Sequence, residues 1–134
     1  MSVTRVLLAD DSPAVLEVVR RILEPEFEVV GSVADGFSLL KAAKKLKPDI
    51  LIVDAMMPGL SGLETIRLLK KRRLPGKAIL LTVLQDPALA EEARFTGALG
   101  YVVKSSADRD LAEAIHEALQ GHFYLSPILR REIS

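Results

Sequence analysis

The chain has 134 residues, 49% of them hydrophobic, which is enough for one compact domain and excludes an intrinsically disordered chain. Its 18 basic and 18 acidic residues give a formal net charge of zero, which argues against a bulk electrostatic grip on nucleic acid or acidic membranes. Cysteine is absent, so disulfides, thiolate metal sites and cysteine nucleophiles are excluded. No apolar run approaches the roughly 20 residues of a membrane span. The N-terminal stretch is too short for a signal peptide, so we expect a cytoplasmic protein without a membrane partner.

Short apolar runs alternate with helical patterns along the chain. The third run, within residues 49–58, contains Ile-Leu-Ile-Val, which is typical of a strand buried on both faces. The strands are predicted, in chain order, at residues 4–9, 27–33, within 49–58, at 77–83 and at 100–104.

Each strand is followed by a helix signal. Ser12 can cap a helix whose first position is Pro13, and Ser61 with Glu64 forms a capping box. The fourth helix, which ends near Thr96, contains few large apolar residues, and we expect it to be the least firmly packed. The five helices are predicted to begin near Ser12-Pro13, Asp35-Gly36, Ser61, Asp86-Pro87 and Ser105.

Five strands alternating with five helices predict an α/β fold. The expected architecture is a doubly wound, five-stranded parallel sheet with helices on both faces. No repeat or interior linker divides the chain, so residues 1–122 are expected to form one domain. Residues 123–134 remain as a C-terminal tail with several apolar residues.

Polar residues cluster where the predicted strands end. In open parallel sheets the ligand site lies beyond the carboxyl ends of the strands. Each residue alone has an ordinary structural explanation, such as a helix cap, a turn residue or a solvated charge. Such explanations do not account for why all of these polar residues lie at the same edge of the sheet. Together they therefore predict a functional site. They are Asp10 and Asp11 after the first strand, Asp54 after the third, Thr82 at the end of the fourth and Lys104 near the end of the fifth.

These side chains favour magnesium and phosphoryl chemistry. Three neighbouring carboxylates cannot all stay ionised without a compensating cation, and an all-oxygen ligand set suits Mg²⁺. One carboxylate would then be able to attack a phosphoryl group and form an acyl phosphate. Thr82 can supply a hydroxyl and Lys104 an ammonium group to the negative oxygens.

Ordered motifs support this interpretation. The stretches "LLADDSP", "DILIVDAMMPGLSGLE", "ILLT" and "GYVVK" closely resemble the receiver domain of bacterial two-component response regulators, over residues 3–122. The resemblance implies the flavodoxin-like receiver fold and a phospho-acceptor rather than an enzyme with a further substrate. Asp54 would accept the phosphoryl group from a sensor histidine kinase and Lys104 would contact that group. Thr82 and Tyr101 match the two switch positions, and Tyr101 is expected to turn inward on phosphorylation.

The resemblance also implies a ligand set for Mg²⁺. Asp11 and Asp54 would bind the ion directly with the backbone carbonyl of Met56, and Asp10 would act largely through water. Many receivers have proline after the lysine, whereas Ser105 follows Lys104 here, which leaves the geometry of that peptide open.

The "KSS" variant at residues 104–106 and the "ALQGHFYLSP" ending are similar to the NarL/LuxR-type subfamily, whose receivers precede a helix-turn-helix DNA-binding domain. Residues 123–134 would then begin a linker to an output domain absent from this chain. Phosphorylation would regulate transcription, with self-association of the receiver, and DNA would be bound only through that output domain. A complete single-domain protein, with its tail packed on the last helix, is the alternative.

Three other functions share parts of this pattern. A flavodoxin-like cofactor binder needs a phosphate-binding loop after the first strand, and Asp-Asp-Ser-Pro repels anions without a metal. An aspartyl-phosphate phosphohydrolase usually needs a further carboxylate and a cap domain. A degenerate interaction module should have lost part of the acidic set, which is complete here.

Overall fold

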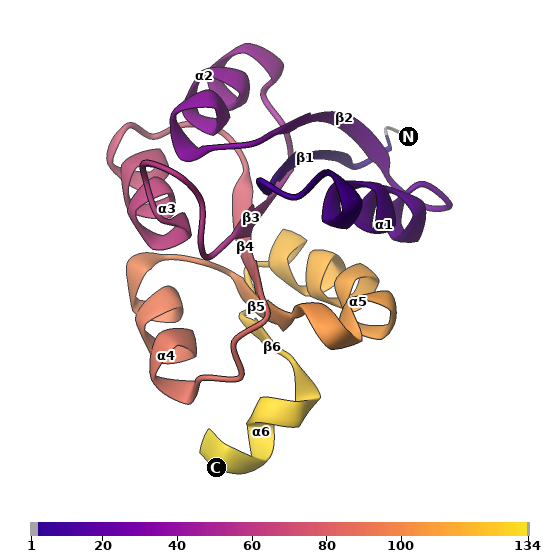
Figure 1. Ribbon diagram of the computed structural model, residues 1–134, viewed down its shortest axis with the longest axis vertical. Helices are drawn as coiled ribbons and strands as arrows, with labels where there is room; N and C mark the ends of the chain where they lie inside the picture. The colour runs from indigo at the N-terminus through magenta and orange to yellow at the C-terminus, as the bar shows by residue number, and fades with distance from the viewer. Residues whose placement is uncertain (1–2, 134) are drawn as a thin grey trace.

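The computed structural model describes residues 3–133 and consists of a parallel sheet between two layers of helices (Figure 1). Its strands are β1 (Arg5–Ala9), β2 (Glu28–Val33), β3 (Ile50–Asp54), β4 (Lys77–Thr82), β5 (Gly100–Val103) and β6 (Tyr124–Leu125). Its helices are α1 (Pro13–Leu23), α2 (Gly36–Leu46), α3 (Gly62–Lys71), α4 (Pro87–Thr96), the 3₁₀ helix η1 (Lys104–Ser106), α5 (Ala107–Leu119) and α6 (Pro127–Ile133).

The strand order is β2-β1-β3-β4-β5-β6, and every pair is parallel. The chain leaves β1 toward β2 and then crosses back to β3, so β1 and β3 become neighbours where the winding reverses. This position is the topological switch point at which open α/β sheets place their ligand site. The predicted doubly wound parallel sheet is therefore confirmed.

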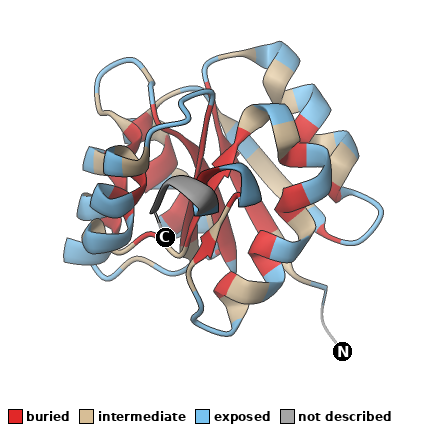
Figure 2. Ribbon diagram, turned by 90° about the horizontal axis from the view of Figure 1, so that it is seen from below, coloured by how far each residue is buried: buried red, intermediate tan, exposed pale blue. Residues whose placement is uncertain are grey.

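Alternation along the strands divides the core into two parts. Leu7, Leu51 and Leu80 face the layer of α2, α3 and α4, whereas the next residues, such as Leu8 and Ile52, face α1 and α5. Figure 1 shows these helices on opposite sides of the sheet, and Figure 2 shows the buried residues gathered on the strands. Burial on both faces explains why the strands read as continuous apolar runs.

Helix starts follow the predicted capping signals. The Ser12 hydroxyl accepts from the Val15 N–H at 3.3 Å, with Pro13 as the first helical residue. Ser61 and Glu64 form the reciprocal capping box. The expectation of weak packing in α4 also agrees with the structure, in which its buried residues are only two alanines, Ala90 and Ala93.

The sheet has six strands, so the prediction of five was wrong. The additional strand, β6, has two residues and pairs Tyr124 with Gly100 of β5. A two-residue strand has no periodicity to detect. Residues 123–130 are packed against the domain rather than extending from it, since Tyr124 is 3% exposed and Leu129 is completely buried.

The end of β5 also differs from the prediction. The strand stops at Val103, and Lys104 begins a short 3₁₀ helix that leads into α5. The described residues contain no cis peptide bond, so the Lys104–Ser105 peptide is trans. No helix in the described part of the chain is long and apolar enough to span a membrane.

Candidate functional site

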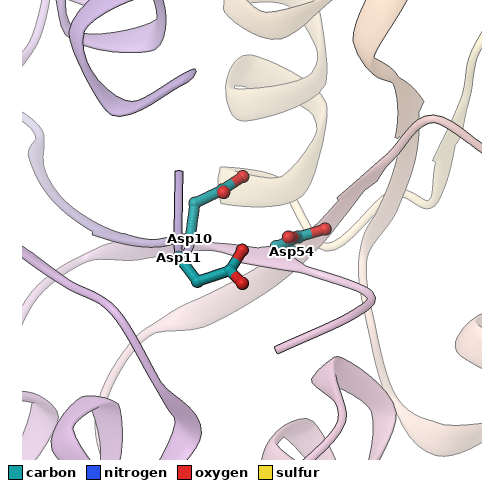
Figure 3. Close-up of side chains that lie close together, drawn as sticks. All are labelled: Asp10, Asp11 and Asp54. Atoms are coloured by element: carbon teal, nitrogen blue, oxygen red, sulfur yellow. The ribbon is translucent and has the colours of Figure 1, made fainter. Parts of the chain in front are cut away.

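The switch point between β1 and β3 brings three carboxylates together. Ala9 pairs with Val53 across the two strands, which sets the following residues, Asp10 and Asp54, side by side at the carboxyl edge of the sheet. Asp10, Asp11 and Asp54 each offer an oxygen within 4.8 Å of the others (Figure 3). The predicted convergence of these three side chains is therefore present.

The carboxylates differ in exposure and in their hydrogen bonds. Asp10 is only 3% exposed, and its Oδ1 accepts from the Ser12 N–H at 2.9 Å. Asp54 is 6% exposed, and its Oδ1 accepts from the Met56 N–H at 3.3 Å. Asp11 is exposed to solvent. Two of the three carboxylates are thus largely removed from water. Backbone N–H groups supply only part of the hydrogen bonds that these two carboxylates can accept.

Lys104 reaches the same cluster from η1. Its Nζ lies 2.8 Å from Asp10 Oδ2 and 3.4 Å from Asp54 Oδ1. Burial alone lowers the pKa of Lys104, but the contact with Asp10 and the charge of Asp54 outweigh it, and the pKa is raised. Lys104 is therefore a permanent cation that bridges carboxylates from two strands.

Asp54 is held in an unfavourable electrostatic position. Burial raises its pKa, and the nearby charge of Asp10 raises it further, whereas Lys104 and the Met56 N–H act in the opposite direction. The net effect is a raised pKa, which means that the ionised form of Asp54 is less stable here than in water. A bound cation or a covalently attached group that removes this repulsion is favoured.

The hydroxyls of Thr82 and Tyr101 lie on β4 and β5, next to this edge. Thr82 is 1% exposed, follows Leu81, the β4 partner of Asp54, and accepts from the Leu84 N–H at 3.1 Å. Tyr101 is completely buried, and its hydroxyl donates to the Leu84 carbonyl at 2.7 Å. Burial raises the pKa of Tyr101 to about 12. Tyr101 is therefore already turned inward in this structure, whereas the expectation was that it turns inward on phosphorylation.

The donor set fits a magnesium ion. All donors in the cluster are carboxylate oxygens, as Mg²⁺ prefers, and one of them, Asp10 Oδ2, is buried without a hydrogen-bond donor in good geometry. Lys104 is close enough to Asp10 Oδ2 to pair electrostatically, but a single ammonium balances only one of three negative charges. The exposed Asp11 leaves one side open to solvent, which suits an ion that keeps several waters.

Met56 follows Asp54 in the loop to α3. Its side chain is 67% exposed, so it does not pack into the core, whereas its neighbour Met57 packs against the core. The predicted use of Met56 through its backbone is compatible with this arrangement. The role of Leu84 was missed because it acts only through its N–H and carbonyl, which carry no sequence signal.

Comparison with known proteins agrees with this geometry. The family model for the response regulator receiver domain matches residues 6–116. The nitrate/nitrite response regulator protein NarL of Escherichia coli is 33% identical over 126 residues, which cover 92% of this chain and 58% of NarL. The response regulator GacA of Pseudomonas aeruginosa is 31% identical, over 97% of this chain and 62% of GacA. The chain thus spans about 60% of the length of these relatives.

Solved structures show the same likeness over almost the whole chain. The crystal structure of a LuxR-family two-component response regulator from an Aurantimonas species matches with a TM-score of 0.92 and 35% identity. The match covers 98% of this chain and 96% of that one. From the family match and the three converging carboxylates, we conclude that the chain belongs to the response regulator receiver domain family.

Proposed function

We propose that Asp54 is the phospho-acceptor of this receiver domain and that a sensor histidine kinase is the donor. The observation that carries the proposal is the position of Asp54, at the end of β3 between Asp10, Asp11 and Lys104. Asp54 is the carboxylate of this set on which burial and like charge act together, and covalent modification removes its negative charge from the cluster.

Phosphoryl transfer at this site needs no general base. A carboxylate oxygen of Asp54, already ionised, attacks the phosphorus of a phosphohistidine and forms the P–O bond of an acyl phosphate. The P–N bond breaks, its electron pair returns to the imidazole, and the imidazole takes a proton from solvent. The ammonium of Lys104, 3.4 Å from Asp54 Oδ1, is placed to pair with a phosphoryl oxygen.

Asp10, Asp11 and Asp54, with the backbone carbonyl of Met56, would hold Mg²⁺. When bound, the ion supplies positive charge that screens the carboxylates and the transferring phosphoryl oxygens. Asp10 and Lys104 are paired at 2.8 Å, which holds the ammonium beside the two buried carboxylates. The Thr82 hydroxyl provides a further donor for the phosphoryl oxygens.

We propose the regulatory output of this receiver from the names of its relatives. NarL and GacA are named as response regulators, and other matches are named as transcriptional regulators, including DegU of Brevibacillus brevis. We infer that residues 1–122 are a receiver unit, that phosphorylation promotes self-association, and that DNA binding and transcription regulation belong to a separate output domain. Phosphoryl transfer from a sensor histidine kinase and regulation of transcription both take place in the cytoplasm, so a cytoplasmic location is part of the proposal.

The decisive test is incubation with Mg²⁺ and acetyl phosphate, followed by intact mass measurement. We expect a gain of one phosphoryl group that is absent from Asp54→Asn, and no gain when Mg²⁺ is chelated. Continuous turnover of added phosphoesters would instead indicate a phosphohydrolase. Absence of any mass gain in the unaltered chain would contradict the acceptor role and favour an interaction module.

Self-association is tested separately by light scattering. The phosphorylated or beryllofluoride-treated chain is expected to have twice the mass of the untreated chain. An unchanged monomer would contradict this part of the proposal and indicate that the output depends on a different partner.

A further inference from the structure

A buried carboxylate outside the acidic site gathers three hydroxyl groups. Asp110, in the first turn of α5, is 5% exposed. Its Oδ2 accepts from the hydroxyls of Ser106 and Ser126, both at 2.7 Å, and its Oδ1 accepts from the Tyr124 hydroxyl at 3.1 Å. These four residues, termed the Asp110 cluster, join η1, α5, β6 and the residue before α6.

The Asp110 cluster holds the residue that precedes Lys104. The Val103 N–H donates to the Ser126 hydroxyl at 3.0 Å. The Ser106 hydroxyl also lies 3.3 Å from the Val103 carbonyl, although its single hydrogen is shared with the closer Asp110 Oδ2, at 2.7 Å. The Val103 N–H is therefore bound, and the Val103 carbonyl is contacted, by side chains that also bind Asp110. A shift of the Val103 backbone, and with it of the start of Lys104, would disturb these contacts.

The charge of Asp110 makes the cluster cooperative. Within the described residues, Asp110 has no salt-bridge partner, so its charge is stabilised by three hydroxyls and by the helix N-terminus. Burial, followed by the charge of Asp110, raises the pKa of Tyr124 to about 12, so its hydroxyl remains a donor at neutral pH. Removing one hydroxyl leaves a buried carboxylate with too few donors and loosens the whole group.

Lys104 depends on an accurate backbone position. Its long side chain must place one ammonium at 2.8 Å from Asp10 and 3.4 Å from Asp54, which lie on different strands. A small displacement of its backbone would separate the ammonium from one carboxylate, and a misplacement of about 1 Å can reduce a rate up to about 100-fold. The elements that fix this backbone include β6, the edge strand beside β5.

We propose that the Asp110 cluster positions Lys104 for phosphoryl transfer, so that β6 and Ser126 form part of the phosphoryl-accepting site. The proposal rests on the acceptor role of Asp54 proposed above. Asp110, Ser106, Tyr124 and Ser126 are positioning residues, since they act through Val103 and Lys104 and touch no reacting atom. Displacement of β6 by a bound partner or by a neighbouring domain would then lower the phosphorylation rate of Asp54.

A double-mutant cycle separates positioning from general stability. Ser126→Ala removes the acceptor of the Val103 N–H and one donor to Asp110, and Tyr124→Phe removes a single hydroxyl with the ring retained. Leu129→Ala is the matched control, because it removes buried packing from the same segment and leaves every hydroxyl of the cluster in place. Each variant is prepared in the Lys104 and in the Lys104→Met background, and phosphoryl uptake from acetyl phosphate is followed by intact mass at saturating Mg²⁺.

With Lys104 present, Ser126→Ala is expected to slow uptake about tenfold and Tyr124→Phe about threefold, while Leu129→Ala stays within about twofold of the unaltered chain. In the Lys104→Met background, Ser126→Ala and Tyr124→Phe should have no further effect. Mg²⁺ affinity should not fall in any of these cluster variants, because the three acidic side chains remain.

Three results would overturn the inference while leaving the acceptor role intact. They are an unchanged rate in both Ser126→Ala and Tyr124→Phe, an equal loss in Leu129→Ala, or the same loss with and without Lys104. Failure of the unaltered chain to take up a phosphoryl group would overturn the acceptor role itself, and this inference with it. Tyr124→Phe keeps the test decisive if Ser126→Ala does not fold.

Discussion

At the scale of single residues, electrostatic repulsion within the site destabilises the ionised form of one carboxylate, Asp54. Burial and the charge of Asp10 raise the pKa of Asp54 above that of the unfolded chain. Stability is therefore lost as the pH rises from the unfolded pKa, near 3.8, through the folded pKa, and the loss is complete above it. Without Mg²⁺ at pH 7, Asp54→Asn should be more stable by about 1 kcal/mol, and urea unfolding measures the difference.

The stabilisation by Asp54→Asn should disappear below pH 3.8, where Asp54 of the unaltered chain is protonated in both states. Asp108→Asn is the control, since Asp108 is exposed in the first turn of α5, where its charge favours the helix. It should not raise stability. A less stable Asp54→Asn at pH 7 would contradict the electrostatic interpretation of the site.

A second residue fixes how closely α3 approaches the acceptor. A Cβ at Gly62 would lie 2.3 Å from the Asp54 carbonyl oxygen and 2.9 Å from the Ala55 Cα. Gly62→Ala must therefore push the start of α3 away from the end of β3. We expect a loss of about 1–3 kcal/mol in unfolding free energy and slower phosphoryl uptake.

Arg67→Ala, at an exposed position of α3, provides the comparison for Gly62→Ala and should change neither stability nor uptake. Thermal unfolding and intact mass give the two measurements. Unaltered uptake in Gly62→Ala would show that the end of β3 tolerates movement of α3.

At the scale of elements, the sequence was sufficient to predict the strands and helix caps that regular local patterns encode. The five longer strands, their parallel order and the caps at Ser12 and Ser61 follow from local signals, and the ends of parallel strands then bring Asp10 and Asp54 together. β6 and the Asp110 cluster could not be predicted, because they depend on tertiary contacts between segments about 20 residues apart. The backbone contacts of Leu84 have no residue preference to detect.

The element expected to move is α4. Its buried residues are two alanines, and Phe95 on the same helix is 94% exposed, so few apolar contacts hold it to the sheet. The loop before it is tied to β5 by the Tyr101 hydroxyl at the Leu84 carbonyl. Relaxation-dispersion NMR should therefore find exchange centred on residues 82–104, reduced by a phosphoryl mimic.

Tyr101→Phe removes that single hydrogen bond and should increase the exchange amplitude in the same residues. Ser38→Ala is the matched control, because its hydroxyl binds Asp35 at the start of α2 rather than the β4–α4 loop. Uniform rigidity over residues 82–104, with and without the mimic, would contradict a mobile α4.

At the scale of the whole molecule, the proposed magnesium site would link metal binding to folding. Asp54 joins the adjacent Asp10 and Asp11 only when β1 and β3 are paired, so the unfolded chain has no equivalent three-carboxylate site. A ligand that binds only the folded state stabilises it by RT ln(1 + [L]/Kd), about 1.4 kcal/mol at ten times Kd. For a domain of this size, the melting temperature should rise by about 3–6 °C.

Differential scanning fluorimetry across a Mg²⁺ titration measures this increase in stability. Asp11→Ala should abolish this increase, because it removes one of the three carboxylates of the site. Asp11 is exposed and supports no buried contact, so its removal should not change stability in another way. Asp54→Asn should weaken the response, and it begins from a higher melting temperature because its repulsion with Asp10 is gone. The Asp110 cluster variants should respond to Mg²⁺ as the unaltered chain does, since Lys104 and the cluster are proposed to act on the phosphoryl group and the three carboxylates remain in place. An equal Mg²⁺ response in Asp11→Ala would show that the ion binds elsewhere, and the three carboxylates would then be balanced by Lys104 and solvent alone.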